Sequence, residues 1–163
     1  MHKLVVHFDD DPFITGLSAG ILRQHDITVV QRIRSEHVFE ILRRFNPGVV
    51  LLEIEMQGSQ GLDLLAAMRE YNPIMQIIVF TRRLSSRLML SALDHGAADF
   101  LTKPLESNDL LVESVHAGFR RLDRWQSQYA ALTKSEKKDD QAVRFDQAQG
   151  HSLLTRQSDS STA

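Results

Sequence analysis

The sequence predicts a doubly wound α/β domain built on a five-stranded parallel sheet. Five short apolar runs alternate with segments that repeat apolar residues at helical spacing. Strands joined through helices pair in parallel, and right-handed crossovers place helices on both faces of the sheet. The third run contains only Val and Leu, which is typical of a central strand buried on both faces. The runs lie at residues 4–8, 27–30, 49–52, 77–80 and 98–101.

Two of the intervening segments show the helical periodicity clearly. The first follows an acidic stretch and Pro12, a residue that suits the first turn of a helix. The fourth follows Ser85, which is a typical N-cap residue. The expected apolar stripes are Phe13, Leu17, Ile21 and Leu22 in the first helix and Leu88, Leu90 and Leu93 in the fourth.

The last helix is expected to extend beyond the sheet. It begins near Asn108, and its apolar positions step by four, four, three, three and four residues. We expect a domain at residues 1–123, an extension of the last helix at 124–133, and a flexible polar tail at 134–163, where Lys, Asp, Gln and Ser dominate. The apolar positions are Leu111, Val115, Phe119, Leu122, Trp125 and Tyr129.

Composition excludes several classes of protein. A net charge of −2 gives no general attraction to nucleic acid or anionic membranes. The chain has no cysteine, so it has neither a disulfide framework nor a thiolate zinc site. Its seven histidines show no HxH or HExxH spacing, and its start resembles neither a signal peptide nor a membrane span. We therefore expect a cytoplasmic protein that does not associate with membranes.

Polar residues follow four of the expected strands, at the points where those strands end. Asp9 and Asp10 follow the first, Glu53 the third, Thr81 the fourth and Lys103 the fifth. Chemistry in open α/β sheets collects outside the carboxyl ends of the strands, so these side chains should meet. Carboxylates suit Mg²⁺, while a lysine and a hydroxyl suit the oxygens of a phosphoryl group.

Four segments resemble the response-regulator receiver domain of two-component signalling, over about residues 3–122. They are LVVHFDDDP, VVLLEIEMQGSQGLDLL, IIVFT and GAADFLTKP. The resemblance implies the flavodoxin-like (βα)5 receiver fold and a role in bacterial phosphorelay signal transduction. It also implies that the partner is a sensor histidine kinase or a downstream signalling protein.

The resemblance also assigns roles to individual residues. An acidic pair would hold Mg²⁺ together with the phosphoacceptor side chain and a backbone carbonyl. A hydroxyl and a lysine would contact the phosphoryl group, an aromatic residue would change rotamer, and a Lys-Pro peptide bond would be cis. The acidic pair is Asp9 and Asp10, the acceptor is Glu53, and the backbone carbonyl is that of Glu55. The hydroxyl is that of Thr81, the lysine is Lys103, the aromatic residue is Phe100, and the proline is Pro104.

Three departures from the family pattern concern the same site. Glu53 stands where the family has its acceptor aspartate, and it is longer by one C–C bond, about 1.5 Å. Gln57 replaces a proline, and Arg82 with Arg83 follows the hydroxyl where a small residue is normal. Either Glu53 imperfectly mimics the phosphorylated state, or phosphotransfer is lost and a docking module remains. We rank phosphorylation of Glu53 itself lowest of these outcomes.

The arginines also allow two interpretations. They can gate the site by pairing with Glu53 or Glu55 and occupying the phosphate's place, or they can be two solvated loop residues. We favour an atypical, phosphorylation-independent receiver, a pseudo-receiver without enzymatic activity. The alternative is a Mg²⁺-dependent phosphatase of dehalogenase type, because Asp9 and Asp11 have that family's spacing.

Output is expected to pass through protein contacts, because the polar tail is too short and too poor in apolar residues to fold as a DNA-binding domain. Leu122, Trp125 and Tyr129 fall on one face of the last helix beyond the expected end of the sheet. They predict an exposed seam for a homodimer or a helical partner. The alternative is a cap folded back over the domain edge.

Overall fold

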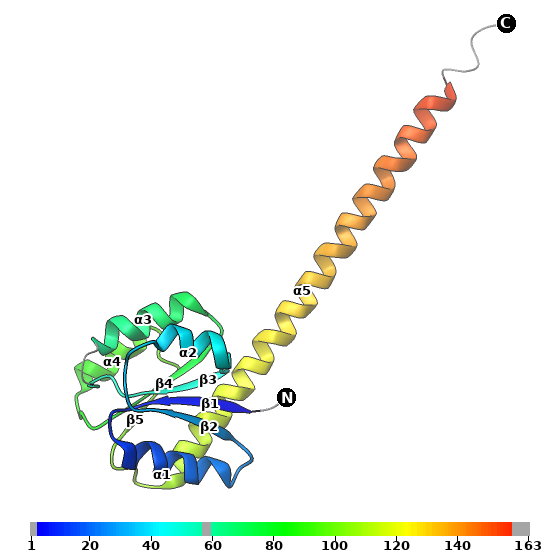
Figure 1. The fold of residues 1–163 in the computed structure, drawn as a ribbon. Helices are drawn as coiled ribbons and strands as arrows, with labels where there is room; N and C mark the ends of the chain where they lie inside the picture. The colour runs from blue at the N-terminus through cyan, green and yellow to red at the C-terminus, as the bar shows by residue number, and fades with distance from the viewer. Residues whose placement is uncertain (1–2, 57–59, 158–163) are drawn as a thin grey trace, which may run out of the picture. The chain divides into compact units, whose positions relative to one another are not determined.

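The structure is a computed structural model that describes residues 3–56 and 60–157, with side chains up to residue 136. Gln57, one of the three departures from the family pattern, lies outside these residues. Five strands and five helices alternate along the described chain (Figure 1). The strands are β1 (Leu4–Phe8), β2 (Thr28–Arg32), β3 (Val49–Leu52), β4 (Gln76–Thr81) and β5 (Asp99–Thr102). The helices are α1 (Pro12–Arg23), α2 (Val38–Phe45), α3 (Gly61–Tyr71), α4 (Ser86–Asp94) and α5 (Asn108–Gln157).

The strands form one parallel sheet in the order β2-β1-β3-β4-β5, which confirms the predicted fold class. The register aligns the strand ends: Phe8 of β1 pairs with Leu52 of β3, and Thr81 of β4 pairs with Thr102 of β5. The residues that follow β1, β3 and β5 therefore emerge along one edge of the sheet, beside the last residue of β4.

Helices cover both faces of the sheet and give the domain two apolar cores (Figure 1). On one face α2, α3 and α4 pack against the sheet around Leu42, Leu65 and Met68. On the other, α1 and the first turns of α5 pack around Leu22 and Phe119. Every residue of β3 is fully buried between the two cores, as its unbroken apolar sequence predicted.

The predicted buried faces of α1 and α4 are wrong in part. Phe13 and Leu17 are 73% and 45% exposed, and α1 instead turns Thr15 and Ser18 toward the sheet. The reason lies in β1, whose His7 points at α1 and hydrogen-bonds Ser18, with 2.7 Å between Nδ1 and Oγ. A polar strand residue is thus matched by two polar residues on the buried face of the helix, beside the apolar Ile21 and Leu22.

In α4, the predicted stripe is also partly on the outside. Leu90 and Leu93 are exposed, whereas Ala92 is fully buried. This helix lies beside α3 and the edge strand β5, so a small residue provides its closest contact with the sheet. Its start matches the prediction, because the Ser85 hydroxyl accepts a hydrogen bond from the Leu88 amide.

Helix α5 continues to Gln157, beyond residue 133, where the sequence predicted that the helix would end. Residues 134–157 contain no proline, and Lys, Gln, Ala, Leu and Arg, which favour helix, make up about half of them. Scarcity of apolar residues excludes a core but does not prevent helix formation. The chain divides into two compact units, Met1–Asp123 and Arg124–Ala163. No helix of the described residues combines the length and apolar composition needed to cross a bilayer.

Gly61 should be essential for the start of α3. A Cβ there would lie 2.0 Å from the carbonyl oxygen of Ile54, a backbone atom that cannot rotate away. We expect Gly61→Ala to lower the free energy of unfolding by about 2–3 kcal/mol in urea titrations. Gly16→Ala on α1 is the matched control, because its Cβ would meet no atom within 4 Å and should stabilise slightly. Equal stability of the two variants would contradict the close contact.

Candidate functional site

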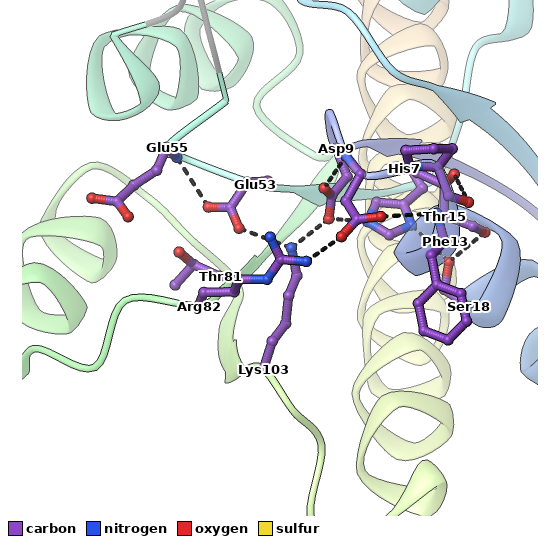
Figure 2. A network of polar contacts seen from close by, with 12 residues as sticks. His7, Asp9, Phe13, Thr15, Ser18, Glu53, Glu55, Thr81, Arg82 and Lys103 are labelled. Carbon is purple, nitrogen blue, oxygen red and sulfur yellow. Dashed lines mark hydrogen bonds and ion pairs between the residues drawn. The ribbon is translucent and has the colours of Figure 1, made fainter.

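The site is centred on the ammonium group of Lys103, which follows β5 and is almost completely buried. Its Nζ donates to Oε2 of Glu53 at 2.8 Å and also to Oδ2 of Asp9 (Figure 2). Both carboxylates are buried as well. The structure thus brings three of the predicted residues into direct contact, from the ends of β1, β3 and β5.

The second oxygen of each carboxylate is held by the backbone. Oδ1 of Asp9 accepts a hydrogen bond from the amide of Asp11 at 2.9 Å. Oε1 of Glu53 accepts one from the amide of Glu55 at 3.0 Å. All four carboxylate oxygens therefore have a donor, which is what buried charges need in order to stay ionised.

Asp9 is strongly stabilised as a carboxylate. Burial alone would raise its pKa, but the nearby His7 imidazole and the hydrogen bonds from Lys103 and the Asp11 amide outweigh burial and lower the pKa to about 2. This residue therefore carries its negative charge near neutral pH.

Sequence reasoning missed His7 as part of the site. The imidazole is fully buried, its Nε2 lies 3.5 Å from Oδ2 of Asp9, and its ring centroid is 5.9 Å from that of Phe80. Burial lowers the pKa of His7. The sequence does contain a feature that could have identified it. A histidine stands inside an apolar strand two residues before Asp9, and residues i and i+2 of a strand share a face. His7 links the site to Ser18 of α1.

Two arginines bridge the loops around the site. Arg83 pairs with Glu55, with 2.7 Å between the guanidinium and Oε1, and Arg82 pairs with Asp11. The hydrogen bond from Arg82 lowers the pKa of Asp11. The pair of Arg83 and Glu55 is one of those that the gating interpretation named, whereas Asp11 was not among the expected partners. Both arginines are more than half exposed, so each pair alone contributes little stability.

The remaining predicted residues lie around this centre. Thr81 is fully buried, and its hydroxyl accepts a hydrogen bond from the Arg83 amide at 3.3 Å. Phe100 is half-buried against the core under α2, α3 and α4. The peptide bond between Lys103 and Pro104 is cis, as the resemblance implied. Asp10 is exposed and lines a different cavity, together with Ile33, Arg34 and Glu36.

The donor set does not fit Mg²⁺ in this arrangement. The ion demands close to six oxygen ligands in octahedral geometry. Here the oxygens of Asp9 and Glu53 accept from Lys103 and from backbone amides. Within the described residues no group of three or more acidic or histidine side chains is placed to hold a metal. Lys103 supplies the positive charge between the carboxylates.

Removal of Lys103 should destabilise the domain. Lys103→Ala leaves two buried carboxylates without their shared cation, so we expect a loss of about 1–3 kcal/mol near neutral pH. Added Mg²⁺ should recover part of that loss in the variant, where the carboxylates are free, and should not stabilise the wild type. The exposed Lys134→Ala is the control and should stay within about 0.5 kcal/mol. Unchanged melting of Lys103→Ala would show that the cluster does not carry this energy.

Asp9 should make the free energy of unfolding depend on pH. Its pKa falls from 3.8 to about 2 on folding, so its contribution is complete above pH ~4 and is lost as the pH falls toward 2. Comparison of wild type with Asp9→Asn by urea unfolding should give a difference of about 2 kcal/mol at pH 6 that shrinks by pH 2–3. Ser127→Ala, at an exposed position, removes no ionisable group and should show no such trend. A difference that does not change with pH would rule out the ionised carboxylate as its source.

Comparisons with known proteins agree with the fold and identify the family. The family model of the response regulator receiver domain matches residues 5–115. The nitrate/nitrite response regulator NarL of Escherichia coli is 33% identical over 109 residues, which are 66% of this chain and 50% of NarL. A protein-glutamate methylesterase/protein-glutamine glutaminase of Bordetella avium is 30% identical over 128 residues, 71% of this chain and 36% of that protein. The chain spans half or less of the length of these two curated relatives.

A solved receiver-domain structure is also similar to this chain. The BeF3-activated N-terminal receiver domain of RstA from Klebsiella pneumoniae is 30% identical, with a TM-score of 0.64, covering 68% of this chain and 94% of that domain. The family match and this structural similarity agree with each other. The chain belongs to the response regulator receiver domain family of two-component signalling.

Proposed function

We propose that this chain is a receiver that works without phosphorylation and transmits its signal through protein contacts. The observation that carries the proposal is the 2.8 Å contact between Oε2 of Glu53 and Nζ of Lys103. In the family pattern this lysine contacts the phosphoryl group. In this chain the carboxylate at the acceptor position already binds it.

The length of Glu53 supports this proposal. The side chain extends about 1.5 Å farther than an aspartate and both of its oxygens are engaged, one by Lys103 and one by the Glu55 amide. A carboxylate that attacks a phosphorus atom needs a free lone pair in line with the leaving group. Each oxygen of Glu53 already directs one lone pair at a donor within the chain.

Arg82 and Arg83 also support a receiver that works without phosphorylation. Both lie in the connection between β4 and α4, and they pair with Asp11 after β1 and Glu55 after β3. A phosphodonor would have to displace these guanidinium groups or pass between them. Neither pair contributes much energy alone, but together they place two positive charges at the mouth of the site.

Of the two non-phosphorylated interpretations, we favour the docking module. Imitation of the phosphorylated state needs both Lys103 and Thr81 to engage the acceptor side chain. Lys103 does so, but in the described residues the Thr81 hydroxyl bonds to the Arg83 amide and makes no hydrogen bond to Glu53. The domain then presents one fixed surface to an intracellular partner, either a sensor kinase or a downstream signalling protein.

The phosphatase alternative is not favoured. The receiver family covers residues 5–115, and the carboxylate of Asp11 caps α1 through the Phe13 amide at 2.9 Å. Asp11 also pairs with Arg82, so it is not free to exchange a proton with a leaving group. The spacing of Asp9 and Asp11 is explained by a helix cap next to a buried ion pair.

Incubation with Mg²⁺ and a small acyl phosphate, read by intact mass, tests the proposal. We expect no stable adduct of about 80 Da on the wild type, roughly one phosphoryl group. Glu53→Asp should restore a weak adduct because it frees Lys103, and Glu53→Asp with Arg82→Ala should increase it. Glu53→Gln is the control that keeps the length but removes the nucleophile. A wild-type adduct mapped to Glu53 would refute phosphorylation independence.

A further inference from the structure

We infer that α5 carries a self-association seam, through which a second copy of this chain docks. The seam consists of Trp125, Tyr129 and Leu132, which are 50%, 72% and 63% exposed. Large apolar side chains are normally buried, and three exposed ones on one stretch of helix mark a partner surface. The inference concerns residues outside the site and does not depend on whether the domain is phosphorylated.

The spacing of the seam is that of a two-helix interface. Trp125, Tyr129 and Leu132 are separated by four and then three residues, the a/d pattern of a coiled coil. The same spacing reaches back to Leu122, which is buried in the core of the domain. The seam therefore begins after Leu122, which is still buried in the core of the domain.

The residues that flank the seam favour an identical partner over a different one. Coiled-coil partners are usually selected by charged residues beside the seam, and like charges repel when two identical helices meet. The four positions directly beside the seam carry no charge, and the nearby guanidinium of Arg124 lies over the Trp125 ring, 6.0 Å from its centroid. Charge at these four positions therefore neither repels a second copy nor selects a helix of opposite charge. These positions are Gln126, Gln128, Thr133 and Ser135.

The seam is short, which limits its strength. The next position in the pattern is Glu136, and two copies of this acid would repel each other across the interface. Pairing is thus confined to about twelve residues, or about 18 Å of helix. Two aromatic residues and one leucine from each copy bury much less than the ~1,200 Å² of a standard stable interface. The dimer should therefore be weak and form only at high concentration.

Light scattering over a range of protein concentrations tests the inference. The wild type should shift from monomer toward dimer as concentration rises. Trp125→Glu with Tyr129→Glu should raise the dissociation constant at least ~30-fold, since buried aromatic residues dominate such interfaces. Ser127→Glu with Ala131→Glu adds the same charge to exposed positions off the seam and should leave association unchanged.

Disulfide trapping gives a second, independent measurement, because the chain contains no cysteine of its own. Tyr129→Cys lies at the middle of the seam and should form a covalent dimer under mild oxidation. Ser127→Cys lies off the seam and should not. A wild type that stays monomeric at all concentrations, equal loss of association in both glutamate variants, or equal trapping of both cysteines would overturn the inference. A different protein captured at Tyr129→Cys in place of a second copy would also overturn it.

Discussion

The buried ammonium of Lys103 is the interaction on which the rest of the site depends. Asp9 and Glu53 are both removed from water, and two carboxylates in such surroundings would repel each other and become protonated. Lys103 between them forms an ion pair with each, and the parallel register of β1, β3, β4 and β5 brings the three residues together. The sheet and the ion cluster therefore specify each other, since a shift in register would separate charges that are stable only in contact.

One methylene group accounts for most of the difference from the family pattern. A glutamate at the end of β3 moves the carboxylate outward, to where Nζ of Lys103 and the Glu55 amide can saturate it. Arg83 then binds the side chain of Glu55, and Arg82 binds Asp11, so positive charge also fills the rim of the site. These substitutions are physically consistent with one another, because each supplies internally a contact that a phosphoryl group or a cation would otherwise make.

Strand ends could be predicted from the sequence because apolar runs locate them directly, and Asp9, Glu53, Thr81 and Lys103 each follow or end such a run. Contacts that depend on helix rotation could not be predicted. The apolar stripe placed Phe13 and Leu17 inward, but they are exposed, and Thr15 and Ser18 are buried beside Ile21 and Leu22, with Ser18 hydrogen-bonded to His7. Similarly, the partner of Arg82 depends on how two loops fold over the site. The sequence indicates that an arginine is present there but not that Asp11 is within its reach.

The two proposals together indicate what such a domain can respond to. A receiver whose lysine is already bound by its own glutamate has no phosphorylation state to report, so the site holds the surface of the domain in one form. A short seam flanked by uncharged residues, by contrast, changes state with the concentration of the chain, because its contact area is too small to hold two copies together at low concentration. Control would then pass from a covalent modification to the amount of protein present. Glu136 sets the upper limit of this response, since extension of the seam past it would pair like charges and would not strengthen the dimer.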